Sequence, residues 1–184
     1  GGLSPEATVM SWRGTSGGIS AALQKHDVIM TPGSGGLYLD HYQGDYKIEP
    51  VTIPSAPAYL SRTYNYEPVP DTIKSLGLEK HILGVQCNNW SEYMYTNAKM
   101  EYQMYPRSLA LAEIAWSPAK KKNFTDFARR VDANSVRLDE RHVRYHIPLP
   151  EQPYGSCDKV VITKDTVVTF QTSRPMKMVY TLDG

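Results

Sequence analysis

Three apolar runs in the first half of the chain each end in a cluster of aromatic and carboxylate side chains. The runs cover residues 7–12, 27–30 and 82–85. Continuous apolar runs that are bounded by turn signals are typical of strands buried on both faces, as in a parallel sheet. In such sheets, ligands bind at the carboxyl ends of the strands. The runs therefore predict an α/β fold with a site built from the residues that follow each run.

The residues at these ends have the chemistry of a sugar-binding site. Trp12 ends the first run, Tyr38 and Asp40 follow the second, and Trp90 and Glu92 follow the third. Aromatic rings cover the apolar C–H face of a sugar, and carboxylates accept hydrogen bonds from its hydroxyl groups. Glu92 lies two positions after Trp90, which in an extended segment would place both side chains on one face. The alternatives are tryptophans of the core, a turn tyrosine at the surface, and surface or salt-bridged carboxylates.

Composition narrows the class of partner. The 184 residues carry a formal net charge of +1, and 41% of them are hydrophobic. This balance argues against nucleic acid or an anionic membrane as the main partner, and no apolar stretch is long enough to cross a bilayer. Thirteen tyrosines against three phenylalanines fit a protein that handles a polar ligand, although half-buried surface tyrosines explain the count equally well.

No metal or cofactor is expected. Cys87 and Cys157 match no metal-ligand spacing. His142 and His146 are one helical turn apart and could reach a single ion, but the sequence suggests no third ligand. Solvent-exposed helix histidines are the better interpretation.

Between and after the strands, helical spacing and turn residues predict the connections. A Gly/Pro/Tyr-rich connection runs from residue 32 to about 70, and loops of that length are usually functional. Helical spacing places Trp116 on the same face as Leu109 and Ala112, which predicts that Trp116 packs in the core. Helices are expected at 16–25, 58–64, 106–116, 123–132 and 138–145. From residue 158 the pattern changes, and a hairpin at 159–170 and a strand at 176–181 are expected.

Four stretches also carry a family resemblance. They are Val-Met-Ser-Trp-Arg-Gly at 9–14, Tyr-Leu-Asp at 38–40, Gly-Val-Gln-Cys-Asn-Asn-Trp-Ser-Glu at 84–92, and 101–116 with its Tyr-Pro-Arg and Ala-Leu-Ala-Glu-Ile-Ala-Trp. In this order and at this spacing they resemble the catalytic domain of glycoside hydrolase family 20 β-N-acetylhexosaminidases. The resemblance implies a partial (β/α)8 barrel, its last three βα units, over residues 1–150. Over residues 151–184 it implies the start of a chitobiase-type β-sandwich domain, seen as a short, incomplete antiparallel segment.

The resemblance also implies a role for each site residue. Tyr38 matches the tyrosine whose hydroxyl donates to the acetamido oxygen of the substrate. Asp40 and Glu92 match carboxylates that bind the sugar hydroxyls at positions 6 and 4. Trp90 matches the base of the sugar pocket, and Trp12 matches a wall of the acetamido pocket.

The catalytic acid implied by the family is an Asp-Glu pair that precedes residue 1. The only adjacent pair here is Asp139-Glu140, in a polar helical stretch with no apolar strand to aim it into a pocket. We therefore expect a fragment of an exo-β-N-acetylhexosaminidase that uses substrate-assisted retaining catalysis, with this chain as a substrate-binding wall. On its own the fragment is expected to be inactive.

This interpretation also predicts the partners of the chain, and two alternative functions stand beside it. The expected partners are glycans that end in N-acetylglucosamine or N-acetylgalactosamine, and the missing N-terminal part of the same protein. Open strand edges predict that the isolated fragment is marginally stable or associates with itself. Export to the periplasm or the medium fits enzymes that meet glycans there. The alternatives are a non-catalytic glycan-binding module and, less favoured, a tyrosine-rich interaction domain.

Overall fold

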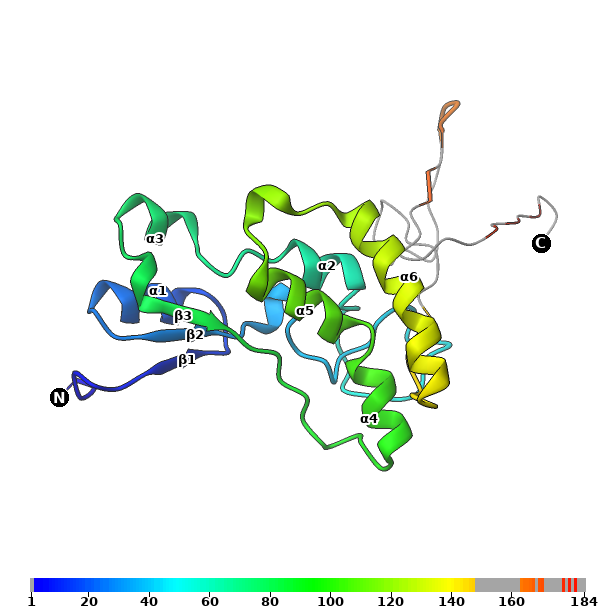
Figure 1. The fold of residues 1–184 in the computed structure, drawn as a ribbon, viewed down its shortest axis with the longest axis horizontal. Coiled ribbons are helices and arrows are strands. Elements are labelled where there is room, and N and C mark those ends of the chain that lie inside the picture. The colour runs from blue at the N-terminus through cyan, green and yellow to red at the C-terminus, as the bar shows by residue number, and fades with distance from the viewer. Residues whose placement is uncertain are drawn as a thin grey trace.

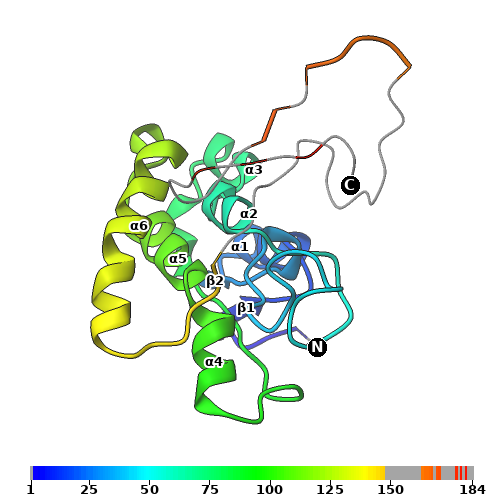
Figure 2. The ribbon, with the colours of Figure 1, turned by 90° about the vertical axis from the view of Figure 1, so that its right-hand side faces the viewer.

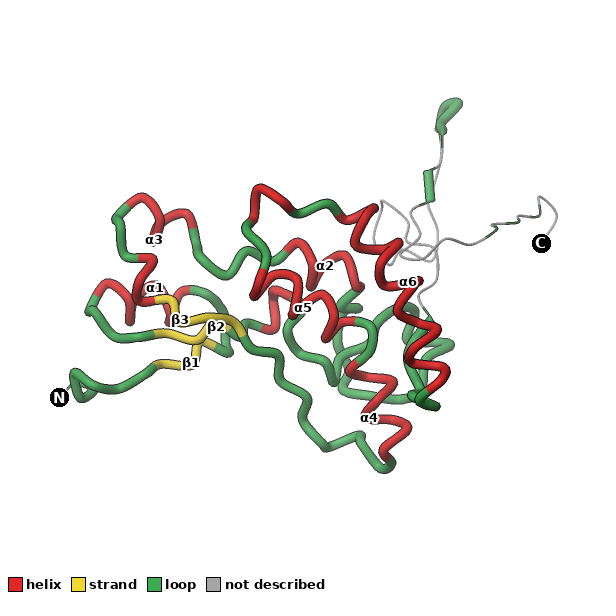
Figure 3. The backbone as a smooth tube through the Cα atoms, in the orientation of Figure 1, coloured by secondary structure: helices red, strands yellow, loops and turns green. Residues whose placement is uncertain are grey.

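The computed structural model describes residues 2–147, 163–167, 169, 170, 177, 179 and 181. Its sheet has three parallel strands in the order β1-β2-β3, so that β2 is the central strand. Figure 3 shows the three strands side by side at one end of the molecule. The strands are β1 (Val9–Ser11), β2 (Val28–Met30) and β3 (Ile82–Val85). All three lie within the apolar runs, and the predicted α/β class is confirmed.

Two crossovers join the parallel strands. Helix α1 (Ser16–Leu23) connects β1 to β2, and the long connection to β3 contains η1 (Gly33–Gly35), α2 (Leu60–Asn65), α3 (Asp71–Ser75) and η2 (Glu79–His81). Ala21 and Ala22 of α1 pack with Val28 and Met30 of β2 and with Ile73 of α3 in a first hydrophobic core. Figure 1 shows α1 and α3 next to the sheet. The parallel sheet and its helices agree with part of a barrel.

A second hydrophobic core lies among the remaining helices. It contains Leu60 and Tyr64 of α2, Ala110 of α5 (Arg107–Trp116), and Phe127 and Val131 of α6 (Phe124–Glu140). The rings of Tyr64 and Phe127 stack with centroids 4.6 Å apart. Each large apolar side chain buried here contributes about 1.5–3 kcal/mol. In Figures 1 and 2, α5 lies between the sheet and α6.

The remaining helices are α4 (Asn97–Met104), capped by the Thr96 hydroxyl, and the short η3 (Ala119–Lys121). Neither α3 nor α4 was predicted. Among the residues that the structure describes, no helix is long and apolar enough to cross a membrane.

The expectation for Trp116 was wrong. Its side chain is 89% exposed, whereas α5 buries Arg107, Ala110 and Ile114. These three positions form a second stripe with the same helical spacing as the predicted stripe that contained Trp116. Ala110 of this second stripe packs with α2 and α6, as does Leu109 of the predicted stripe, whereas Trp116 points away from that core.

The two helices expected at 123–132 and 138–145 are one helix, α6. Asn123 caps it as predicted, accepting a hydrogen bond from the Asp126 amide at 3.0 Å. Ser135 and Leu138 continue its buried face, and the helix ends just before His142, which has a positive φ of 56°. The sequence between the two predicted helices contains no glycine or proline that would end the first one.

Most of the predicted C-terminal β segment, at 159–170 and 176–181, lies outside the described residues. Those that are described, 163–167, 169, 170, 177, 179 and 181, belong to no strand. The domain boundary near residue 150 stays a prediction.

Candidate functional site

The loops that follow the three strands come together at one edge of the sheet. The Leu39 amide donates to the Asn88 carbonyl at 2.7 Å, and the Asn88 amide donates to the Leu37 carbonyl at 2.9 Å. These two bonds join the loop after β2 to the loop after β3. The Gly33 amide donates to the Trp12 carbonyl at 3.4 Å, which joins the loop after β2 to that after β1. The loops at the carboxyl ends of the three strands therefore contact one another, as predicted.

Three predicted aromatic residues form a contiguous cluster there. The Tyr38 and Trp90 rings meet edge to face with centroids 4.6 Å apart, and Trp90 meets Trp12 in the same manner at 6.0 Å. Trp12 is 43% exposed and Trp90 is 37% exposed, so neither is a core tryptophan in the described part of the chain. The cluster offers partly exposed ring surface of the kind that packs against the apolar face of a ligand.

Two contacts fix the position of the Tyr38 side chain. Its hydroxyl donates to the main-chain oxygen of Trp12. A Cβ atom at Gly33 would lie only 2.6 Å from the Tyr38 ring, so glycine leaves the room that this ring occupies. Burial raises the pKa of Tyr38, and the charge of Asp40 acts in the same direction. The hydroxyl is therefore protonated, and able to donate, at neutral pH.

Asp40 is a buried carboxylate whose oxygens are unused. Its side chain is 1% exposed, and no group in the described part of the chain donates a hydrogen bond to either oxygen. Burial raises its pKa and the charge of Glu92 adds to that rise, whereas its own main-chain N–H and the charge of Arg107 oppose it. A buried polar group without partners is costly, so we expect these oxygens to accept hydrogen bonds from a ligand.

Glu92 lies near Asp40 but differs from expectation in conformation. It is exposed, and residues 91–93 form a bend and turn rather than an extended segment. The geometric reason given for placing Trp90 and Glu92 on one face is therefore wrong. The charge of Glu92 still acts on Asp40, because it raises the pKa of that carboxyl group.

Sequence reasoning missed three neighbours of these residues. His41 packs edge-on against Tyr38 with ring centroids 5.3 Å apart. The guanidinium of Arg13 lies 4.7 Å from the Trp12 ring centroid. Both follow a predicted site residue directly, which is the signal that could have identified them. The amide of Asn89, next to Trp90, is also buried, and neither of its polar atoms has a partner in the described chain.

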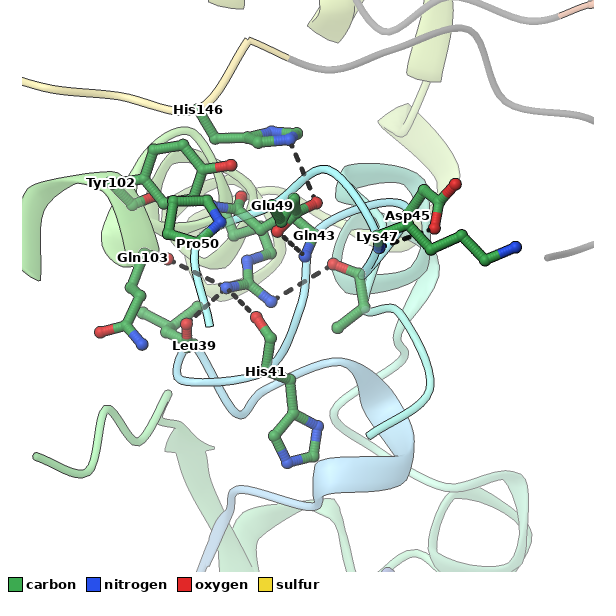
Figure 4. A network of polar contacts seen from close by, with 12 residues as sticks. Leu39, His41, Gln43, Asp45, Lys47, Glu49, Pro50, Tyr102, Gln103 and His146 are labelled. Atoms are coloured by element: carbon green, nitrogen blue, oxygen red, sulfur yellow. Dashed lines mark hydrogen bonds and ion pairs between the residues drawn. The ribbon is translucent and has the colours of Figure 1, made fainter. Parts of the chain in front are cut away.

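No metal site accompanies the cluster in the part of the chain that the structure describes, where no three His, Cys, Asp or Glu side chains are grouped to hold an ion. The expectation of solvent-exposed helix histidines is wrong for His146. Both His142 and His146 lie after the end of α6, and His146 is buried and contacts Glu49, with 3.4 Å between Nε2 and Oε1 (Figure 4). The adjacent pair Asp139-Glu140 is exposed at the end of α6.

Comparison with known proteins identifies the family of the chain. The model of the glycosyl hydrolase family 20 catalytic domain matches residues 2–119. The chain is 60% identical over its whole length to a beta-hexosaminidase of Porphyromonas gingivalis, of which it covers 23%. It is 36% identical over 60% of its length to a beta-hexosaminidase of Vibrio furnissii, of which it covers 18%. The chain thus spans about a fifth of the length of these relatives.

A solved structure shares the fold. It is an exo beta-N-acetylglucosaminidase from Vibrio harveyi in complex with N-acetylglucosamine, and it matches with a TM-score of 0.71 and 30% identity. The match covers 78% of this chain and 22% of the Vibrio harveyi chain. With the family model matching well over half of its residues, the chain belongs to glycosyl hydrolase family 20.

Proposed function

We propose that the protein containing this chain is an exo-acting β-N-acetylhexosaminidase, which removes terminal N-acetylglucosamine or N-acetylgalactosamine from glycans. The chain supplies one wall of its substrate site. The observation that carries the proposal is the contact of Trp12, Tyr38 and Trp90 at the strand ends, with the unpartnered carboxylate of Asp40 two residues after Tyr38. The names of the relatives, beta-hexosaminidase and exo beta-N-acetylglucosaminidase, support it.

The proposed reaction uses the acetamido group of the substrate as nucleophile. Its carbonyl oxygen attacks the anomeric carbon, the bond to the leaving oxygen breaks, and an oxazolinium ion forms with the configuration later retained by attack of water. A glutamic acid outside this chain protonates the leaving oxygen, and the aspartate before it orients the acetamido N–H. The chain contributes the donor and the walls, not the acid.

Tyr38 is the donor in this proposal. Negative charge on the acetamido oxygen falls as it attacks, and a fixed hydroxyl keeps this oxygen aimed at the anomeric carbon while the charge redistributes. The hydroxyl already lies beside Trp12, because it donates to that residue's main-chain oxygen. To donate to a substrate oxygen, the hydroxyl has to give up this bond and rotate about its C–O bond.

The other residues bind the sugar itself. Trp90 and Trp12 cover the apolar face of the ring and the acetamido methyl group. Asp40 accepts from the hydroxyl at position 6 and Glu92 from that at position 4. Asp40 is preorganised for this task, since its oxygens are buried and no other residue in the described part of the chain donates a hydrogen bond to them.

The test compares two substrates of the full-length protein that differ only at position 2. We expect p-nitrophenyl N-acetyl-β-D-glucosaminide to be hydrolysed with retention, and the matched β-D-glucoside to resist, because its 2-hydroxyl cannot act as the nucleophile. Equal hydrolysis of both, or inversion at the anomeric carbon, would contradict the proposal. Binding of N-acetylglucosamine without hydrolysis would support a glycan-binding module instead.

A further inference from the structure

Four consecutive main-chain carbonyls, those of residues 38–41, are each held by a hydrogen bond. Arg107 Nη1 donates to the Tyr38 oxygen at 3.4 Å, and Nη2 donates to the Leu39 oxygen at 2.5 Å and to the His41 oxygen at 3.1 Å. The remaining carbonyl, that of Asp40, accepts a hydrogen bond from the Thr52 hydroxyl. The segment that carries both Tyr38 and Asp40 is therefore fixed along its whole length.

One guanidinium group makes most of these bonds. Arg107 is fully buried, and it also donates to the Ala58 oxygen at 3.3 Å and the Gln103 oxygen at 3.0 Å. Figure 4 shows Leu39, His41 and Gln103 gathered around one point, with dashed lines that meet there. A planar guanidinium presents its donors in fixed directions, so it sets the relative positions of the carbonyls that it binds.

A second contact supports the same segment. Gln103 Nε2 donates to Thr52 Oγ1 at 3.1 Å, and Thr52 in turn donates to the Asp40 oxygen. Gln103 belongs to α4 and Arg107 begins α5, so the junction between these two helices holds the segment by two routes. All three supporting side chains are almost completely buried. None of them belongs to the aromatic cluster.

Arg107 also acts on Asp40 through its charge. Burial lowers the pKa of Arg107 to about 10, so the guanidinium is still charged at neutral pH. That charge lowers the pKa of Asp40, against the effects of burial and of Glu92. The same side chain that fixes the main chain around Asp40 thus favours the ionised carboxylate.

We propose that Arg107 is the positioning residue of this site, which aligns Tyr38 and Asp40 on a single sugar and so sets the preference for a substrate with a 6-hydroxyl group. The inference rests on the proposed function. A purely structural arginine would support the fold without any effect on which substrate is preferred. The two roles therefore differ in what a conservative substitution changes.

The experiment measures kcat and KM of the full-length protein with p-nitrophenyl N-acetyl-β-D-glucosaminide and with its 6-deoxy analogue. Arg107→Lys keeps the charge but cannot bind several carbonyls at once. We expect the ratio of kcat/KM between the two substrates to fall by about 10-fold to 100-fold, since a misplacement of about 1 Å can cost 100-fold. Arg130→Lys is the matched control, because Arg130 pairs with Glu113 and Asp126 on the outer helices and should leave the ratio unchanged.

Thr52→Val covers the case in which the Arg107→Lys protein does not fold. It removes only the hydroxyl that holds the Asp40 carbonyl, and we expect a smaller fall in the same ratio. Ser135→Ala is its control, since that hydroxyl donates to the Asp132 carbonyl within α6.

Two kinds of negative result are distinguishable. If Arg107→Lys and Thr52→Val leave the ratio of kcat/KM between the two substrates unchanged, the inference is overturned. Wild-type activity on the N-acetylglucosaminide would still uphold the proposed function. A wild-type protein that neither binds nor hydrolyses N-acetylglucosaminides would overturn both.

Discussion

Replacing Tyr38 with phenylalanine removes one hydroxyl and keeps the ring that packs against Trp90 and fits above Gly33. The hydroxyl makes a hydrogen bond to the Trp12 main-chain oxygen, so its loss should cost about 0.5–1.5 kcal/mol of folding stability. If the hydroxyl also holds the acetamido oxygen during attack, the effect on catalysis is larger. Loss of the hydroxyl that aims the acetamido oxygen should lower kcat by about 10-fold to 1000-fold, or roughly 1.4–4 kcal/mol, because a misplacement of about 1 Å can cost about 100-fold.

The assay compares kcat and KM of the full-length wild-type protein and Tyr38→Phe with p-nitrophenyl N-acetyl-β-D-glucosaminide. The control is Tyr95→Phe, because Tyr95 is 82% exposed and lies outside the aromatic cluster. Thermal melting of each variant separates a loss of folded protein from a loss of catalysis. A Tyr38→Phe protein with wild-type kcat would refute the role of this hydroxyl, whatever happened to KM.

Three further predictions concern the space around the Tyr38 ring, the charge of Asp40 and the stability of the isolated chain. Gly33→Ala should lower folding stability by about 1–3 kcal/mol and reduce activity, because the added Cβ would press on the Tyr38 ring. Gly84→Ala is the control, since no atom lies within 4 Å of its added Cβ and the ring should be unaffected. Thermal melting and steady-state assays check both variants. The raised pKa of Asp40 means that the folded state binds its proton more tightly than the unfolded state, so stability falls as pH rises from about 4 through the raised value. Asp40→Asn should remove that fall, seen in melts at pH 4 and pH 7, while weakening sugar affinity by calorimetry; an unaltered pH dependence would count against it. The isolated chain should melt without a sharp transition or sediment as oligomers, because no described strand pairs with the outer edges of β1 and β3; a cooperatively folded monomer would show this wrong.

The strands and their ends could be predicted because apolar runs bounded by turn residues carry a strong local signal. Each observed strand lies inside a predicted run, and the residues after the runs do meet. The choice between two stripes on α5 could not be made in this way. The stripes of Ala110 and of Trp116 have the same spacing, and only packing against α2 and α6 decides which is buried.

Sequence reasoning suggests a structural role for Arg107, as a partner of Glu113 or of neighbouring residues, but it does not identify the partners that the structure shows. Arginine is rarely buried without a partner, and its partners here are carbonyls from residues 38, 39, 41, 58 and 103. No local pattern links positions so far apart. The turn at 91–93 escaped for a different reason, since nothing in Ser91-Glu92-Tyr93 distinguishes a bend from an extended segment.

The most direct test of the proposed site is a crystal structure of the full-length protein with N-acetylglucosamine bound. We predict that the sugar lies on Trp90 with its acetamido group beside Trp12, its carbonyl oxygen within hydrogen-bond distance of the Tyr38 hydroxyl, and its 6-hydroxyl on Asp40. A sugar bound elsewhere, with the Asp40 oxygens still without a donor, would contradict the account.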